Sequence, residues 1–326
     1  MNSKLPYIAL LSLSYLACSA CTLEPSSAAK DVTEQKPGTI RDTVDSLRLI
    51  KINIDGAEND IPPAVKPLLT TLKHQIRDVI QTRINSSFIR TNPDELRGSV
   101  LADLKDLGVT VEDPEPSIVD DSYSDTSYTY GDIWGISLEN PASREDLLVA
   151  TTTLGVCCGR DTSLYFFQND GARWDLAMAV EANDYNDVSG AQGRFQYRIS
   201  SPDRLSNFFV VAANVNPWCT SNWQSLRFKV FRPGQTAYEP RVLLSEERTI
   251  WLGGGFEDER AYRLRLRGNR FSLEFYGEKF LKSMADGDDT DDSEPLDVAS
   301  YKVIQDQVII LHKAVTDIPN VQETAR

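Results

Sequence analysis

The pattern of apolar and polar positions separates a helical first part of the chain from a longer part made of strands. Apolar and polar residues alternate over 50–54, which predicts a half-buried strand. From Val65 to Ile80 the apolar residues recur at helical spacing, so a helix with one buried stripe is expected there. The residues predicted to face away from its core are Lys73, His74, Arg77 and Asp78.

A second helix is predicted from its end signals. Asn92 can cap the N-terminus, Pro93 suits the first turn, and Gly108 follows the last apolar residue. We therefore expect a small α/β domain with two helices over 45–111. The next segment, 112–129, is acidic, rich in Pro, Ser and Tyr, and without an apolar face, which is typical of a linker.

Beyond residue 130 the apolar period changes to two, which predicts β-strands. Over 262–266 one face is apolar and the other cationic, as in an antiparallel sheet with one solvated side. Phe208–Val211 has no alternation, which indicates a central strand covered on both faces. The strands are expected at 147–154, 163–168, 174–180, 194–199, 208–215, 226–231, 242–244, 262–266, 271–276 and 301–312.

These strands predict a mostly β fold: an antiparallel β-sandwich or meandering barrel over 130–315, with the small N-terminal α/β piece before it and a tail over 316–326. Three hairpins are loosely alike, so a propeller-like arrangement is the alternative. The smallest propellers use about 16 strands in four blades, which exceeds the number predicted. A sandwich or a barrel is therefore favoured.

Residues 1–20 have the pattern of a secretory signal peptide. Lys4 is the only charged residue, and an apolar run of about 13 residues follows, too short to cross a bilayer. The sequence Cys18-Ser19-Ala20-Cys21 resembles the lipobox of bacterial lipoproteins, in which the cysteine after a small residue is diacylated and becomes the new N-terminus. This resemblance implies lipidation of Cys21; ordinary cleavage after Ala20 is the alternative.

Residues 21–44 are expected to form a linker, because most of them are polar or small and show no apolar period. We therefore expect an exported protein, in the periplasm or at the cell surface, that the lipid on Cys21 anchors to a membrane. The chain carries a net charge of −14, so anionic headgroups should repel its folded body. The same acidity argues against nucleic acid as a partner.

Three cysteines follow Cys21 in the chain, and an oxidising compartment favours a disulfide between Cys219 and either Cys157 or Cys158. Neighbouring strand residues point to opposite faces, so only one of the two can readily reach Cys219. No metal site is expected at these thiols, because no histidine accompanies them.

The common catalytic motifs are missing: there is no G-x-S-x-G, H-E-x-x-H or glycine-rich phosphate loop. A glycosidase, however, needs only two carboxyls about 5–10 Å apart. Glu181 and Asp184 follow the predicted strand 174–180, and Asp175 lies on it. The competing interpretation is a hairpin loop in which Asn and Asp tolerate turn geometry.

The segment 214–223 holds two tryptophans among amides and hydroxyls. Flat aromatic rings can bind a sugar ring or a peptide while neighbouring amides bind hydroxyl groups. Alternatively, the rings form a structural plug around Cys219. The predicted binding residues are Trp218, Trp223, Asn216, Asn222 and Tyr185.

The acidic run 286–297 has oxygen ligands at the spacing of a calcium-binding EF-hand loop. Asp291 stands where that loop requires glycine, so a solvated loop without a cofactor is expected, with calcium as the alternative. The function expected overall is a non-catalytic binding module of the bacterial envelope, with a cell-wall glycan or an envelope protein as partner. A secreted glycan hydrolase that uses carboxylates is the alternative.

Overall fold

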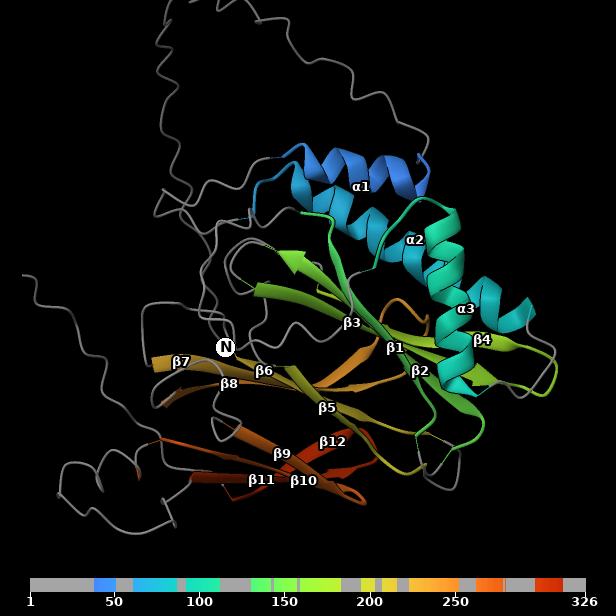
Figure 1. The fold of residues 1–326 in the computed structure, drawn as a ribbon. Coiled ribbons are helices and arrows are strands. Elements are labelled where there is room, and N and C mark those ends of the chain that lie inside the picture. Colours follow the sequence, from blue (N-terminus) through green and yellow to red (C-terminus); the bar gives the residue numbers. More distant parts are fainter. Residues whose placement is uncertain are drawn as a thin grey trace, which may run out of the picture. The chain divides into compact units, whose positions relative to one another are not determined.

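The computed structural model describes residues 38–50, 61–86, 92–111, 130–141, 144–156, 159–182, 195–202, 207–215, 223–251, 262–277, 279 and 297–312. All of them belong to one compact unit, residues 37–326. The described part contains three α-helices followed by twelve β-strands (Figure 1). The chain is therefore mostly β, as predicted.

The three helices come first in the described part: α1 (Ile40–Arg48), α2 (Val65–Ser86) and α3 (Pro93–Asp106). Helix α1 begins with a capping box, in which the Thr39 hydroxyl accepts the Asp42 N–H and the Asp42 carboxylate accepts the Thr39 N–H. This helix starts inside the segment predicted as a linker. The Asn92 cap of α3 is confirmed.

The strands form three antiparallel sheets of four strands each, and in every sheet the strands follow one another in chain order. Sheet A contains β1 (Ile133–Glu139), β2 (Leu147–Val156), β3 (Gly159–Asn169) and β4 (Trp174–Val180). Sheet B contains β5 (Phe195–Ile199), β6 (Val210–Val215), β7 (Trp223–Arg232) and β8 (Arg241–Trp251). Sheet C contains β9 (Tyr262–Arg267), β10 (Arg270–Phe275), β11 (Asp297–Ile304) and β12 (Gln307–His312).

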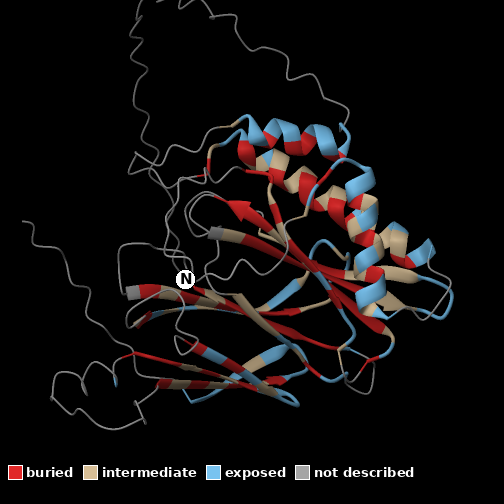
Figure 2. Ribbon diagram, viewed as in Figure 1, coloured by how far each residue is buried: buried red, intermediate tan, exposed pale blue. Residues whose placement is uncertain are grey.

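Three hydrophobic cores hold the layers together. One joins the helices to sheet A, a second joins sheet A to sheet B, and a third joins sheet B to sheet C. The fold is thus a stack of a helical layer and three sheets, with the buried residues concentrated between the layers (Figures 1 and 2). No described core joins sheets A and C, so the sheets stack openly, as a β-sandwich does, and do not close into a barrel or surround a channel.

Sheet B is covered on both faces along β6 and the residues just before it. Along the chain from Phe208 to Val211, successive residues alternate between the core shared with sheet A and the core shared with sheet C. Successive strand residues point to opposite faces, so a strand with two buried faces needs an unbroken apolar run. The prediction of a doubly covered central strand is confirmed.

The strand assignments differ from the prediction at three main places. Residues 301–312 form a hairpin of β11 and β12 rather than one strand, because Gln305 and Asp306 make a two-residue turn and Gln305 takes a positive φ of 52°. Strand β8 runs to Trp251, beyond the predicted end at Leu244. The residues after Leu244 are mostly polar, and β8 can carry them because it is the last strand of sheet B. Strand β1 had no predicted counterpart. The strand expected over 50–54 and the linker expected over 112–129 lie almost entirely outside the described residues.

Among the described helices, none is both long and apolar enough to span a membrane.

Candidate functional site

Helix α2 directs two basic side chains at sheet A rather than at solvent. The Lys73 side chain is fully buried and that of Arg77 is only 7% exposed. The prediction that both face away from the core was wrong. Helix α2 contacts α1, α3, β3 and β4, so its buried surface is wider than its apolar stripe and includes these two positions.

Lys73 forms an ion pair with Asp161 on β3. Its Nζ lies 3.1 Å from Asp161 Oδ2, and both side chains are fully buried. The same Nζ donates to the carbonyl of Ala182, just after β4. Buried charges cost free energy unless they are paired and hydrogen-bonded, so these contacts fix α2 against two strands of sheet A.

Glu181 is the second carboxylate beneath α2. Its side chain is 6% exposed, with Oε1 4.0 Å from Nη1 of Arg77 and Oε2 3.5 Å from Nε2 of His74. On β3, the Tyr165 hydroxyl donates to the Lys73 carbonyl at 3.4 Å. Burial, followed by the charge of Glu181, raises the pKa of this phenol well above its usual value. The buried ion cluster is defined as Lys73, Arg77, Asp161 and Glu181.

The connection between β7 and β8 covers one end of the buried ion cluster. The Ala237 carbonyl accepts the Ala179 N–H of β4 at 2.7 Å. This contact brings the Tyr238 ring against Arg77, whose guanidinium carbon lies 4.7 Å from the ring centroid. A loop of sheet B thereby contacts the helical layer.

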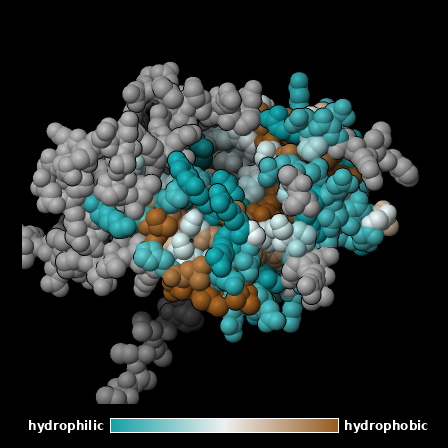
Figure 3. Space-filling view, turned by 90° about the horizontal axis from the view of Figure 1, so that it is seen from below, coloured by the Kyte–Doolittle hydropathy of each residue, from teal (hydrophilic) through white to brown (hydrophobic). Residues whose placement is uncertain are grey.

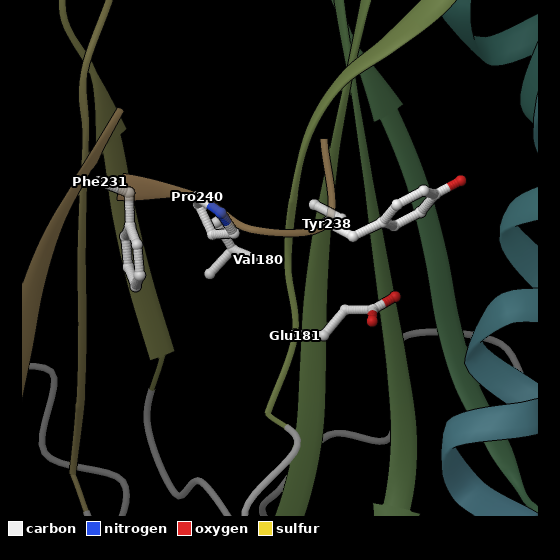
Figure 4. Close-up of a pocket in the computed structure, with 6 residues that line it drawn as sticks. Val180, Glu181, Phe231, Tyr238 and Pro240 are labelled. Atoms are coloured by element: carbon white, nitrogen blue, oxygen red, sulfur yellow. The ribbon is translucent and has the colours of Figure 1, made fainter. Parts of the chain in front are cut away.

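A small cavity adjoins this end of the cluster. Its lining includes Val180, Glu181, Phe231, Tyr238 and Pro240, and the polar ends of Glu181 and Tyr238 are directed toward α2 (Figure 4). The cavity volume is about 60 Å³, whereas ligand pockets usually measure about 300–1,000 Å³. There is room for a few water molecules but not for a sugar. The contacts of the buried ion cluster join helix α2 to sheet A.

The carboxyls considered for glycan hydrolysis do not all come together. Asp175 is the second residue of β4 and Glu181 follows its last. At a rise of about 3.3 Å per residue they are about 20 Å apart, twice the separation that glycosidases use. Asp175 instead pairs with Arg173 at 3.0 Å. Asp184 lies outside the described residues.

A second candidate site lies at one end of sheet B. Trp223 and Trp251 are direct partners in the antiparallel register of β7 and β8, and such partners occupy the same face. Trp223 was a predicted binding residue, whereas Trp251 was not, because the predicted strand ended before it. The predicted binding and disulfide residues outside the described part are Asn216, Trp218, Asn222, Tyr185, Cys157, Cys158 and Cys219.

Polar residues continue this face along the two strands. Ser225 Oγ donates to Glu247 Oε1, and Arg227 Nε lies 3.4 Å from Glu247 Oε2. The hydrogen bond from Ser225, with the charge of Arg227, holds the pKa of Glu247 below its usual value. We define the tryptophan face as Trp223, Ser225, Arg227, Glu247, Thr249 and Trp251, which the register places together.

Within the described ranges, no group of three or more His, Cys, Asp or Glu side chains could hold a metal ion. Of the acidic run 286–297, only Asp297 is described. It is buried at the start of β11, and its Oδ2 accepts the Lys279 N–H at 3.3 Å. The solvated loop expected here and its calcium-binding alternative both concern residues that lie, apart from Asp297, outside the described part.

Comparisons with protein-family models, with curated proteins and with solved structures found no match to this chain.

Proposed function

We propose that this chain is an exported, lipid-anchored protein of the bacterial envelope that binds a cell-wall glycan without transforming it. The observation that carries the proposed binding is the pairing of positions 223 and 251, beside Ser225, Arg227 and Glu247. An aromatic ring covers the apolar face of a pyranose, while hydroxyl, guanidinium and carboxylate groups bind its hydroxyls. Export and acylation are supported by the sequence of residues 1–21 alone.

The first prediction concerns Trp251. We expect Trp251→Ala to weaken binding to purified peptidoglycan sacculi about 30-fold, since the loss of an aromatic anchor costs about 2 kcal/mol. Co-sedimentation with sacculi measures the change. The matched control is Tyr238→Ala, because Tyr238 is exposed and lies in the connection at the other end of β7 and β8, where Arg232 pairs with Arg241. It should bind like the unchanged protein.

Four results would contradict this proposal. The unchanged protein could fail to sediment with sacculi, or Trp251→Ala could bind as tightly as the unchanged protein. Release of soluble reducing sugars from the sacculi would favour the hydrolase instead. If only an envelope protein binds at the tryptophan face, the glycan is the wrong partner.

The second prediction concerns the N-terminus. Mass spectrometry of the membrane fraction should find a chain that begins at a diacylated Cys21, and Cys21→Ser should abolish the lipid-modified species. A thiol count on the same sample should find one free thiol among Cys157, Cys158 and Cys219 if one of the pair is bonded to Cys219. An intact Met1 on an intracellular species with every thiol free would refute both export and the disulfide.

A further inference from the structure

The outer face of sheet C is strongly basic in an acidic chain. Its inner face packs on sheet B, and alternate residues of its strands therefore point outward. Five cations and a single carboxylate, Glu274, lie among these outward positions. The five cations, which we call the basic face, are Arg263, Arg265, Arg267, Arg270 and Lys302.

Three members of the basic face lie abreast on neighbouring strands. Arg267 is the direct partner of Arg270, which is the direct partner of Lys302. Like charges in direct cross-strand pairs destabilise a sheet. Glu274 pairs with Arg263 and Arg265, whereas no described carboxylate pairs with the row of three. An external anion would offset this repulsion.

Apolar side chains border the row of cations. Ile309 on β12 is the direct partner of Lys302 and is 43% exposed, and Ile304 follows on the same face of β11 at 40% exposure. Strand β12 carries no Asp, Glu, Lys or Arg, although sheet edges are usually protected by charged residues. Figure 3, seen from the side of sheet C, shows hydrophilic residues beside hydrophobic ones.

We propose that the basic face, with Ile304 and Ile309, docks on the surface of a bilayer that contains anionic phospholipid. Basic residues bind the headgroups of such a surface, and adjacent aliphatic side chains enter the boundary with the acyl chains. A wide sheet face matches a planar array of anions better than it matches one small ligand.

Acidic side chains of the helices and of sheet A oppose this docking little at physiological ionic strength, although the chain as a whole carries a net charge of −14. The screening length there is about 8 Å, and stacked sheets lie about 10 Å apart. Charges on the other layers are therefore largely screened from a surface that touches sheet C. Instead of repelling the whole folded body, anionic headgroups should attract sheet C, so that sheet C faces the membrane.

The third prediction tests this docking with residues 37–326, the compact unit that holds every described element and lacks the proposed lipid anchor. Residues 37–326 should sediment with phosphatidylglycerol vesicles, not with phosphatidylcholine vesicles, and less strongly as salt increases. The triple variant Arg267→Gln, Arg270→Gln, Lys302→Gln should bind about 100-fold more weakly, at about fivefold per cation. The control variant Lys105→Gln, Arg173→Gln, Arg198→Gln removes three exposed cations from other elements.

The proposal requires that the variant of the basic face loses binding to anionic vesicles and that the control variant keeps it. It is overturned if residues 37–326 do not sediment with anionic vesicles, if both variants lose binding equally, or if binding is limited to a soluble polyanion such as heparin. Circular dichroism confirms that both variants are folded. Since no acyl group is present, failure here leaves the N-terminal proposal intact, and an unacylated Cys21 leaves this one intact.

Discussion

Placing a carboxylate at either of two neighbouring positions, Val210 or Val211, is expected to abolish folding. Both side chains are fully buried, but in different cores: Val210 faces sheet A and Val211 faces sheet C. An unpaired carboxylate in either core costs more than about 4 kcal/mol. Domains have only about 5–15 kcal/mol of stability, so Val210→Asp and Val211→Asp should each yield little folded protein.

Sheet C provides the matched comparison, because only one of its faces is covered. Phe271→Asp should be as harmful as the changes in sheet B, since Phe271 packs against that sheet. Ser272→Asp should cost less than about 0.5 kcal/mol, because Ser272 faces outward opposite Arg265. Soluble yield and urea unfolding measure all four variants. A stable Val210→Asp protein would contradict the packing of sheet A on sheet B.

The sequence allows this central layer to be predicted because covering a strand on both faces changes its pattern. Phe208–Val211 lacks the alternation of apolar and polar residues that Tyr262–Leu266 shows. The first segment is buried on both faces and the second on one face only. The hairpin within 301–312 was missed for a local reason. Gln305 and Asp306 form its turn without the glycine or asparagine that usually marks a positive φ.

The candidate sites were less accessible to sequence reasoning. Trp223 was recognised by its neighbours in the chain, whereas Trp251 is its partner through a register that no local pattern shows. The basic face has the same origin: Arg267, Arg270 and Lys302 become a row only when three strands are aligned. The helical spacing places Lys73 at a position typical of a surface residue. The carboxylate that pairs with it, Asp161, is far away in the sequence, on β3.

Replacing Lys73 with methionine is expected to lower the free energy of unfolding by about 3–5 kcal/mol. The change keeps an apolar stem of similar length but leaves Asp161 fully buried without its cation. The same replacement at Arg173, which is 69% exposed and paired with Asp175, should cost less than about 1 kcal/mol. Urea unfolding of the two variants measures the difference.

The double variant Lys73→Met, Asp161→Leu shows whether the loss arises from the unpaired charge or from the packing of α2. If the unpaired charge is the cause, removing both charges should restore most of the stability, because an apolar pair of similar volume can replace a buried ion pair. A double variant as unstable as Lys73→Met would instead assign the loss to packing. A loss of less than about 1 kcal/mol in Lys73→Met would contradict the burial of the pair. The hydrogen bond from Lys73 to Ala182 is absent in both variants, so their difference isolates the carboxylate of Asp161.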